Sequence, residues 1–355
     1  MMPMRHAVIF GGAGFIGSNV ANRLLSQGQR VLIFDSMARP GVERNVDWLE
    51  ARHGDLLRVQ VGDVRDSRAV RRAVRGAGQV FHFAAQVAVT TSLADPLEDF
   101  EVNARGTLNV LEAIRAQDLR PSLLFTSTNK VYGGLHDIAL ELRGRRYRPK
   151  DPSLRSIDES RPLDFESPYG CSKGCADQYV LDYARSYGIP AVVFRMSCIY
   201  GPRQFGTEDQ GWVAHFLIRA LQGLPITVYG DGKQVRDALY VEDLVDAMLS
   251  AHDSIERTSG QAFNMGGGAS RTISLLELLE IITELTGRAP EVRYGPWRTG
   301  DQRYYVSDTR KFQATTGWAP RTTIREGVAR LHAWLREMAS ESKAANLSDT
   351  EATAG

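Results

Sequence analysis

Short apolar runs alternate with amphipathic stretches through the N-terminal half of the chain. Five runs rich in Val, Ile, Leu and Phe have the length of buried strands, and stretches with helical periodicity separate several of them. The strand candidates are residues 7–10, 30–35, 58–63, 79–85 and 122–128, and the helix candidates are 15–27, 66–75 and 98–117. Strands and helices that alternate in this way predict a parallel sheet with right-handed crossover connections.

The pattern continues to about residue 200 and then loosens. Ser167 can cap a helix predicted over 167–188, and the apolar run 191–201 returns to the sheet. The polar segment 135–166 lacks a clear period and predicts a long loop over one face. The elements expected beyond it are helices at 212–222, 241–252, 274–287 and 323–338 and a strand at 226–229.

Composition and charge narrow the class of protein only slightly. Of the 355 residues 43% are hydrophobic and 24% are charged, and the net charge of +1 creates no field that would attract nucleic acid or a membrane. The three cysteines, Cys171, Cys175 and Cys198, form neither a disulfide framework nor a zinc pattern. The N-terminus is too short and polar for a signal peptide, and no run approaches a membrane helix. We therefore expect a cytoplasmic protein without metal, nucleic acid or membrane partners.

A glycine-rich turn follows the first strand. In "VIFGGAGFIGSNV", Gly11, Gly14 and Gly17 stand between the strand and the next helix, where glycine allows a tight turn and a close approach of pyrophosphate to the positive helix end. Asp35 ends the second strand, where a carboxylate accepts hydrogen bonds from the adenosine ribose and repels a 2′-phosphate. This arrangement predicts NAD rather than NADP as the cofactor. Asp63 and Val64 follow the third strand and are placed to meet the adenine.

The fold predicted from these features is α/β, with a Rossmann-type doubly wound parallel sheet and a smaller mixed C-terminal substrate domain. We expect residues 1–195 to form the NAD-binding domain, with 236–262 returning to it. The substrate domain would comprise 196–235 and 263–338, and the polar end 339–355 is expected to be disordered.

A cluster of hydroxyl groups ends the fifth strand. In "LLFTSTNKVYG" (123–133), Thr126, Ser127 and Thr128 lie at the carboxyl end of the strand, where ligands of doubly wound sheets bind. Tyr169 and Lys173 are four residues apart on a helix and so share one face. A phenol has a free pKa of about 10, and a nearby ammonium favours its phenolate. Tyr169 can then take a proton from a substrate hydroxyl that Thr128 holds in place.

These motifs together resemble the extended short-chain dehydrogenase/reductases that act on nucleotide sugars, from the N-terminus to about residue 335. Six blocks are most similar to the epimerases that invert C2 of a CDP-hexose such as CDP-paratose or CDP-tyvelose: 86–115, 127–133, 167–185, 200–216, 230–244 and 300–308. The resemblance implies that Thr128, Tyr169 and Lys173 are catalytic. It also implies that Asn103, in "EVNARGT", supports the cofactor and the active-site backbone, and that Ser197 contacts the nicotinamide.

The residues expected to hold NAD come from the ends of most of the predicted strands, where small Ala84 and Ala85 leave room for the cofactor. They are Gly11, Gly14, Phe15, Ile16, Gly17, Asp35, Ser36, Asp63, Val64, Ala84, Ala85, Gln86, Asn103, Ser127, Tyr169, Lys173 and Ser197.

The pair Asn129–Lys130 argues for epimerisation over dehydration. The related 4,6-dehydratases usually carry Asp-Glu directly after the threonine, and neither an amide nor an amine can serve as a carboxylic acid. An epimerase needs no such acid, because Tyr169 is base first and acid second, and its cofactor stays bound since no net redox change occurs. Whether Asn129 and Lys130 touch the substrate or only support the loop stays open at this point.

The substrate end is expected to bind a nucleoside diphosphate sugar. Arg203, Arg236 and Arg303 lie in polar turns of the resembling blocks, and the planar guanidinium suits a diphosphate. The other substrate contacts expected are Thr90, Thr91, Ser92, Thr128, Asn129, Gln210 and Trp212. His82 is expected to be a core histidine. In the superfamily, the helices that match 108–114 and 180–187 form a dimer interface, so we expect a homodimer or homotetramer.

Two other functions use the same motifs. The first is inversion at C4 of a UDP-hexose or another nucleotide hexose, which the same catalytic residues would serve. The second is a non-catalytic NAD-binding regulator, against which the intact Tyr169 and Lys173 speak.

Overall fold

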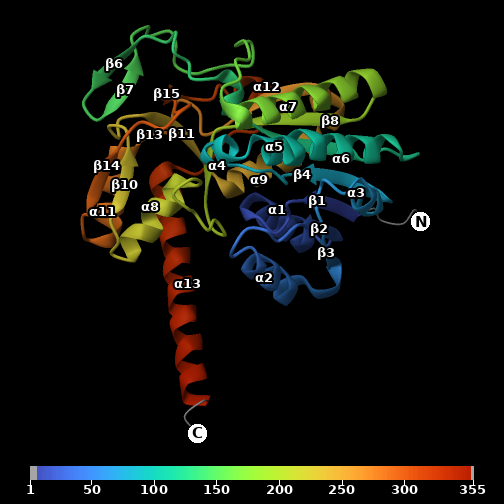
Figure 1. Ribbon diagram of the computed structural model, residues 1–355, viewed down its shortest axis with the longest axis horizontal. Coiled ribbons are helices and arrows are strands. Elements are labelled where there is room, and N and C mark those ends of the chain that lie inside the picture. Colours follow the sequence, from blue (N-terminus) through green and yellow to red (C-terminus); the bar gives the residue numbers. More distant parts are fainter. Residues whose placement is uncertain (1–5, 353–355) are drawn as a thin grey trace.

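Seven parallel strands form the main sheet of the molecule (Figure 1). The computed structural model describes residues 6–352, with side chains described for 6–340. The strands lie in the order β12–β8–β5–β4–β1–β2–β3. Their bounds are β1 (His6–Phe10), β2 (Val31–Asp35), β3 (Leu57–Val61), β4 (Ala77–His82), β5 (Ser122–Thr128), β8 (Ala191–Met196) and β12 (Gln261–Met265).

Both faces of this sheet are covered by helices, because successive residues of each strand point to opposite sides. Ala7 and Ile9 of β1 pack with α1 (Phe15–Ser26), α2 (Glu43–His53) and α9 (Val241–Asp253) on one face. Val8 and Phe10 pack with α3 (Ser67–Val74), α6 (Gly106–Arg115) and α7 (Ser167–Tyr187) on the other face. The predicted doubly wound α/β sheet is therefore confirmed.

The helix predicted over 98–117 is interrupted. It divides into α5 (Pro96–Phe100), a π-helical turn over Glu101–Arg105, and α6. The wide turn carries Asn103 into the interior, where the side chain is almost completely buried. Helices α2 and α4 (Val89–Ala94) were not predicted.

Two smaller sheets and the helices that cover them form a second layer, most of which follows β8 in the chain. The chain expected as one strand over 191–201 breaks at Ser197, whose hydroxyl donates to Asp237 Oδ1 at 2.5 Å. After the break, β9 (Cys198–Tyr200) leaves the main sheet and pairs with β11 (Val235–Tyr240). This smaller sheet also contains β13 (Thr272–Ser274) and β15 (Tyr304–Tyr305), and β10 (Ile226–Tyr229) pairs separately with β14 (Val292–Gly295).

Helices cover this second layer and connect it back to the main sheet. Apolar residues of α8 (Trp212–Leu221), α11 (Leu275–Thr286) and α13 (Ile324–Ala352) pack around β10 and β11. The remaining helices are α10 (Ile255–Thr258) and α12 (Arg310–Thr316). We expected 236–262 to return to the N-terminal domain. In the structure α9 and β12 do so, whereas β11 belongs to the smaller sheet. The complete domain division stays a prediction.

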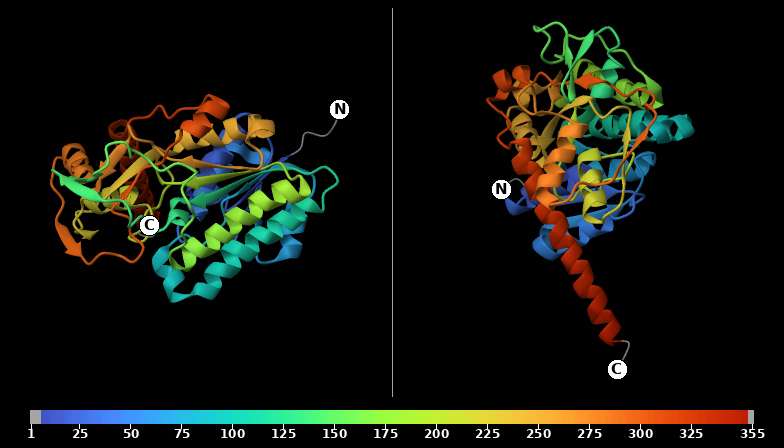
Figure 2. Two further views of the ribbon diagram at one scale, coloured as in Figure 1. Left: turned by 90° about the horizontal axis from the view of Figure 1, so that it is seen from above. Right: turned by 90° about the vertical axis from the view of Figure 1, so that its left-hand side faces the viewer.

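Two segments differ from the sequence-based expectation. The expected loop 135–166 contains a hairpin, β6 (Leu140–Arg143) and β7 (Arg146–Pro149), which turns at Gly144 with φ +61°. At the other end, α13 continues to Ala352 and projects from the molecule, where we expected disorder from 339 (Figures 1 and 2). Residues 353–355 of that expected tail lie outside the described residues. Within residues 6–352, no helix is both long and apolar enough to span a bilayer.

His82 is buried at the carboxyl end of the central strand β4 as a neutral ring, as expected for a core histidine. The Thr107 hydroxyl donates to Asn103 O at 2.6 Å, so it accepts from His82 Nε2 at 3.0 Å. Nδ1 therefore carries no proton, and it has no partner among the described residues. Burial, with a smaller effect of the Lys173 charge, lowers the pKa of His82 to about 3.

We expect His82→Gln to flatten the acid side of the stability curve. Glutamine can donate to Thr107 but cannot be protonated. The unfolded histidine titrates near 6.5, so the unfolded wild type binds more protons below that pH and its stability falls. Between pH 6.5 and 5 the wild type should lose about 1.6 kcal/mol relative to the variant, because the unfolded histidine is already half protonated at pH 6.5 and the slope approaches 1.36 kcal/mol per pH unit only below it. Urea unfolding followed by circular dichroism measures both curves, and parallel curves would contradict the prediction.

Candidate active site

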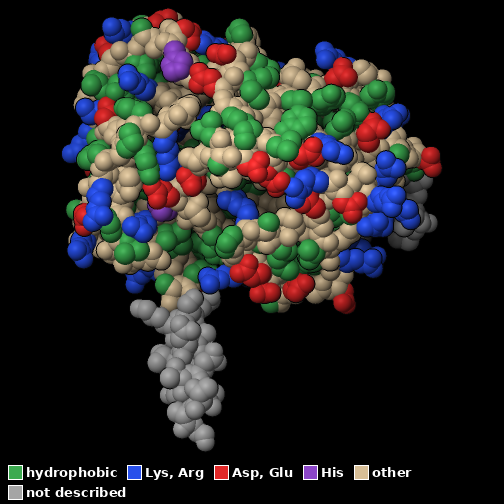
Figure 3. Space-filling view, in the orientation of Figure 1, with side chains coloured by type: hydrophobic (Ala, Val, Ile, Leu, Met, Phe, Trp, Pro, Cys, Tyr) green, Lys and Arg blue, Asp and Glu red, His purple; other side chains and the backbone are tan. Residues whose placement is uncertain are grey.

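A cavity of about 1010 Å³ opens where the carboxyl ends of β1, β2, β4 and β5 face the second layer. Its walls come from the main sheet, from α7, and from the loops around α8, β11 and β15. On the face of the molecule shown in Figure 3, acidic and basic side chains are interspersed rather than segregated by sign. The lining of the cavity likewise contains charges of both signs, among them Asp35, Glu98, Lys173 and Arg236.

The glycine turn leaves no room for side chains on one wall of the cavity. Gly11 has φ +77°, and a Cβ there would lie 2.6 Å from the backbone nitrogen of Ala84. A Cβ on Gly17 would lie 2.3 Å from the Gly11 carbonyl oxygen. No side chain caps the N-terminus of α1, which starts directly after Gly14. The first N–H groups of α1 are thus open to an anionic ligand such as a pyrophosphate.

Asp35 stands at the end of β2 with its carboxylate held by the backbone. Oδ2 accepts from Ala13 N and Oδ1 from Met37 N, both at 3.0 Å. Burial raises the pKa of Asp35, while these two hydrogen bonds and the nearby Arg39 oppose the shift. A carboxylate fixed in this way can accept hydrogen bonds from ribose hydroxyls at the cavity wall. Arg39, which the sequence analysis did not identify, also donates to Gln210 across the cavity mouth.

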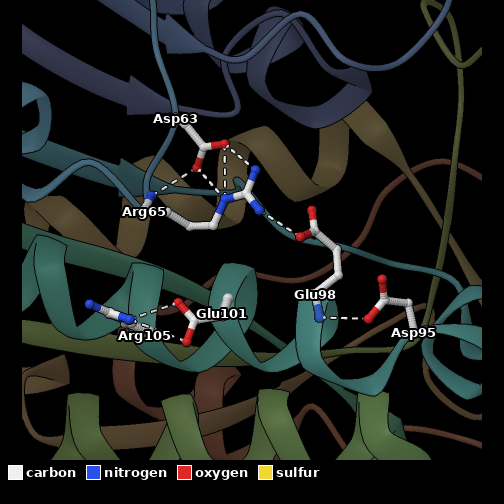
Figure 4. Close-up of polar contacts among 6 residues, drawn as sticks. All are labelled: Asp63, Arg65, Asp95, Glu98, Glu101 and Arg105. Atoms are coloured by element: carbon white, nitrogen blue, oxygen red, sulfur yellow. Dashed lines mark hydrogen bonds and ion pairs between the residues drawn. The ribbon is translucent and has the colours of Figure 1, made fainter.

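The expected adenine end is closed by an ion-pair bridge (Figure 4). The Arg65 side chain donates to both carboxylate oxygens of Asp63, and its Nη1 lies 2.5 Å from Glu98 Oε2 on α5. These hydrogen bonds hold the pKa of Asp63 below its usual value. Asp63 and Val64 line the cavity as predicted, and Arg65 and Glu98 are additional lining residues. Because all three charged groups are partly exposed, the bridge shapes the wall more than it stabilises the fold.

Asn103 supports the cavity from behind and does not line it. Its Oδ1 accepts from Gln86 N at 2.9 Å, and its Nδ2 donates to Gln86 O at 3.0 Å. The amide thus fixes the backbone of Gln86, which itself lines the cavity beside Ala84 and Ala85. Nδ2 also reaches Ser172 on α7 at 3.1 Å, so the π-helical turn connects β4 to α7. This position matches a supporting role better than a direct cofactor contact.

Thr128, Tyr169 and Lys173 converge on one part of the cavity. Burial raises the pKa of Tyr169 to about 12, and a hydrogen bond with Thr128 opposes the shift. Burial lowers the pKa of Lys173 to about 7, with Asp177 and Asp99 acting against it. A phenol with this pKa stays protonated near neutrality. It becomes a base only when positive charge, from Lys173 and from a bound oxidised nicotinamide, favours the phenolate.

Unsatisfied polar atoms gather at the cavity and mark it as a ligand site. Ser127 Oγ, Gln204 Oε1 and Gln234 Oε1 are buried, lie on cavity-lining residues and have no hydrogen-bond partner among the described residues. Buried polar groups without partners are rare in native proteins. Together with the glycine turn and Asp35, they fit a dinucleotide: the phosphates at α1, the ribose at Asp35 and the nicotinamide beside Ser127. The other expected cofactor residues that line the cavity are Phe15, Ile16, Ser36 and Ser197.

The residues expected to bind substrate divide into two groups. The first group lines the cavity, and it comprises Thr90, Thr91, Thr128, Asn129, Gln210, Trp212 and Arg236. Ser92, Arg203 and Arg303 do not line it. Ser92 is fully buried, and its Oγ accepts from Tyr169 N at 3.1 Å, so it holds the start of α7 rather than a sugar.

Arg203 and Arg303 correct the sequence-based prediction because both guanidinium groups stack on aromatic rings. The Arg203 guanidinium lies 3.8 Å from the ring centre of Trp48 and 5.7 Å from that of Trp334, and so connects α2 to α13. Arg303 lies 5.2 Å from the Trp297 ring centre and 5.7 Å from that of Tyr147. Sequence spacing does not reveal which arginines of polar turns meet an aromatic face.

Several lining residues were not predicted to contact a ligand. The group includes Tyr229, Trp297, Arg298 and Asp301, and Lys130, whose contact with the substrate the sequence left open, also lines the cavity. All of them lie in turns or strand ends with ordinary polar composition. Only the position of Lys130, two residues after Thr128, offered a signal in the sequence.

Comparison with known proteins places this site in a family. The sequence model of the NAD dependent epimerase/dehydratase family matches residues 7–266. The chain is 42% identical over 334 residues to the CDP-paratose 2-epimerase of Salmonella typhi, which covers 92% of this chain and 98% of that relative.

Solved structures agree with this result. The UDP-glucose 4-epimerase of Thermus thermophilus in complex with NAD superposes with a TM-score of 0.78 at 35% identity and covers 93% of this chain and 99% of that one. The UDP-glucose 4-epimerase of Thermotoga maritima with UDP-glucose gives a TM-score of 0.81 at 30% identity and covers 94% and 99%.

We expect Ser127→Ala to weaken NAD binding without destabilising the protein. The unpaired Ser127 hydroxyl contributes nothing to the folded apoprotein, so its removal should leave the melting temperature unchanged or higher. Loss of one hydrogen bond to the cofactor should weaken NAD binding about threefold to tenfold. Calorimetric titration of NAD into the apoprotein measures this.

Ser122→Ala on the same strand provides the matched control. Its hydroxyl bonds His252 Nδ1 at 2.8 Å, away from the cavity. This variant should show the opposite result, a lower melting temperature with unchanged NAD affinity. If both variants behave alike, Ser127 does not contact the cofactor.

Proposed function

Because this chain belongs to the NAD dependent epimerase/dehydratase family, we propose that it inverts C2 of a CDP-hexose, CDP-paratose or CDP-tyvelose, and retains NAD throughout. It is an NAD-dependent enzyme, as the sequence analysis predicted. The observation that carries the proposed substrate is the 42% identity to CDP-paratose 2-epimerase, which extends over 92% of this chain and 98% of that relative.

The geometry supports a reaction in which the proton and the hydride leave the same carbinol. When bound, NAD supplies a hydride acceptor that later returns the hydride. Tyr169 removes the proton of the C2 hydroxyl, and Thr128, which hydrogen-bonds the Tyr169 phenol, holds the same oxygen. The positive charge of Lys173 makes the phenolate accessible near neutral pH. The 2-keto sugar must then turn over in the cavity, after which Tyr169 gives the proton back and the opposite configuration results.

The residues after Thr128 speak against loss of water. Asn129 Nδ2 donates to Gln302 Oε1 at 2.7 Å and Lys130 Nζ donates to Gly300 O at 2.8 Å, so neither residue supplies the carboxylic acid pair that the related dehydratases carry after the threonine. The 30% identity to the dTDP-glucose 4,6-dehydratase of Xanthomonas campestris therefore reflects the shared fold more than shared chemistry.

Inversion at C4 of a UDP-hexose is the second candidate. The 35% identity to the NAD-bound UDP-glucose 4-epimerase favours it, and the same three catalytic residues would serve. One assay separates the two functions. Purified protein without added NAD is incubated with CDP-paratose or UDP-glucose in heavy water and followed by NMR. Inversion at C2 without deuterium there supports the proposal, and deuterium at C2 would argue for enolisation instead.

We expect Tyr169→Phe to lower kcat by about 10²–10⁴, the usual contribution of a general acid–base group. The variant should keep its bound NAD, because Tyr169 is only one of many residues expected to hold the cofactor. Tyr294→Phe is the control, since Tyr294 is 63% exposed on β14 and does not line the cavity. An active Tyr169→Phe protein would favour the remaining alternative, a non-catalytic NAD-binding regulator.

We further propose that the protein is a homodimer or a homotetramer assembled through α5, α6 and α7. These helices lie side by side, and hydrophobic side chains gather over them in the space-filling view (Figures 2 and 3). Leu97 is 69% exposed and Phe100 49%, and Tyr179 and Tyr187 are also exposed. A contiguous apolar surface of this kind is typical of a protein interface. We also propose a cytoplasmic location, which the free thiols of all three cysteines fit.

We expect Leu97→Glu to shift the protein toward the monomer, because it places a charge in the apolar interface. Light scattering after size exclusion measures the mass. Leu142→Glu is the control, since Leu142 is 52% exposed on the β6–β7 hairpin, far from α5. A wild type that is already monomeric, or equal shifts in both variants, would contradict this interface.

A further inference from the structure

Lys130 is held rigidly beside the catalytic threonine. It belongs to a short 3₁₀ helix, Asn129–Tyr132, in which the side chains of Val131 and Tyr132 are buried. The backbone N–H of Lys130 donates to Thr128 Oγ1 at 3.2 Å. The side chain lines the cavity, and Nζ donates to the Gly300 carbonyl oxygen at 2.8 Å. Its position is therefore determined at both ends by the protein.

The ammonium group retains hydrogen-bonding capacity that the protein does not use. Nζ carries three N–H donors, and the bond to Gly300 engages one of them. The charged groups that face it are Arg236, Asp301 and Glu166. Asp301 is already engaged, since Arg236 Nη2 donates to its Oδ1 at 2.6 Å. Burial lowers the pKa of Lys130 to about 8, with a further contribution from Arg236. A desolvated cation with free donors is a site for an anionic oxygen.

The location of Lys130 identifies that oxygen. On one side is Thr128, which would hold the reacting sugar oxygen, and on the other is Arg236, the cavity-lining arginine suited to a diphosphate. A nucleotide sugar with its reacting hydroxyl at Thr128 and its diphosphate at Arg236 would place the junction between sugar and diphosphate between these two groups. We propose that Lys130 is a substrate-binding residue that donates to the sugar-linked phosphate of the nucleotide sugar. This inference rests on the proposed function and deepens it.

The same residue connects substrate binding to the turn at 299–302. Lys130 holds Gly300, and Asn129 holds Gln302, so both residues after the catalytic threonine fasten this turn. The turn carries Asp301, the partner of Arg236. A phosphate bound by Lys130 and Arg236 would therefore complete a set of contacts that closes this side of the cavity.

The test compares nucleotides with and without the second phosphate. CDP and CMP are titrated into NAD-loaded wild type, Lys130→Met and Lys130→Arg. We expect Lys130→Met to weaken CDP binding at least tenfold and to change CMP binding less than twofold. Lys130→Arg, which keeps the charge, should bind CDP within about threefold of wild type. Lys150→Met at an exposed site is the matched control and should change neither affinity.

A pH series provides a second readout. The wild-type affinity for CDP should fall as the pH rises through 8 toward 9.5, because Lys130 loses its proton. In Lys130→Arg it should not fall, since arginine stays charged. NAD content and melting temperature confirm that each variant is folded.

The outcomes separate this inference from the proposed function. If Lys130→Met weakens CDP and CMP equally, or weakens neither, the inference is overturned while the function stands. If the wild type binds CDP with the expected Lys130 dependence but inverts no CDP-hexose, the function is overturned and the phosphate contact stands. If UDP binds better than CDP, the UDP and UMP pair tests Lys130 in the same way, because the second phosphate is common to both nucleotides.

Discussion

A buried ammonium that must keep its charge beside a phenol is the constraint on which the site depends. Lys173 is almost completely buried, with its Nζ 4.3 Å from the ring centre of Phe125, and burial alone favours the neutral amine. Two carboxylates oppose this tendency, Asp99 on α5 and Asp177 one helical turn beyond Lys173. Neither carboxylate could remain buried without partners of its own. Much of the surrounding structure therefore serves to hold the carboxylates of Asp99 and Asp177 close to Lys173.

Each acid is held by a different part of the fold. Asp177 forms a two-point ion pair with Arg195 of β8, with both contacts at 2.9–3.0 Å, which joins α7 to the sheet beneath it. Asp99 accepts from Ser172 and from Asn103, and Asn103 in turn fixes the backbone of Gln86. The π-helical turn is what places Asn103 between these groups. Through Asn103, the π-helical turn thus links Asp99, which stabilises the charge of Lys173, to Gln86 in the cavity wall.

The sequence predicted those features that have a local cause. Strands β1 to β5 are apolar runs, and the glycine turn and the Tyr169–Lys173 pair follow from spacing within single elements. The hairpin 140–149 was missed because its residues are polar and its partners, such as Lys233, lie far along the chain. Ser92 and Arg203 were assigned to the substrate because a hydroxyl and a guanidinium can both bind a sugar or a phosphate. The sequence does not show that Ser92 faces the start of a helix or that Arg203 faces an aromatic ring.

The contrast between Thr128 and the two residues after it shows where sequence and structure each contribute. Chemistry alone excludes Asn129 and Lys130 as carboxylic acids, and this is visible in the sequence. Their contacts with Gln302 and Gly300 span about 170 residues and join the main sheet to the second layer. The absence of an acid pair therefore does more than remove a dehydration step. Asn129 and Lys130 instead hold the turn that contains Gly300 and Gln302, next to Arg236. The same short segment therefore argues against dehydration and also shapes the pocket in which the keto sugar must turn over.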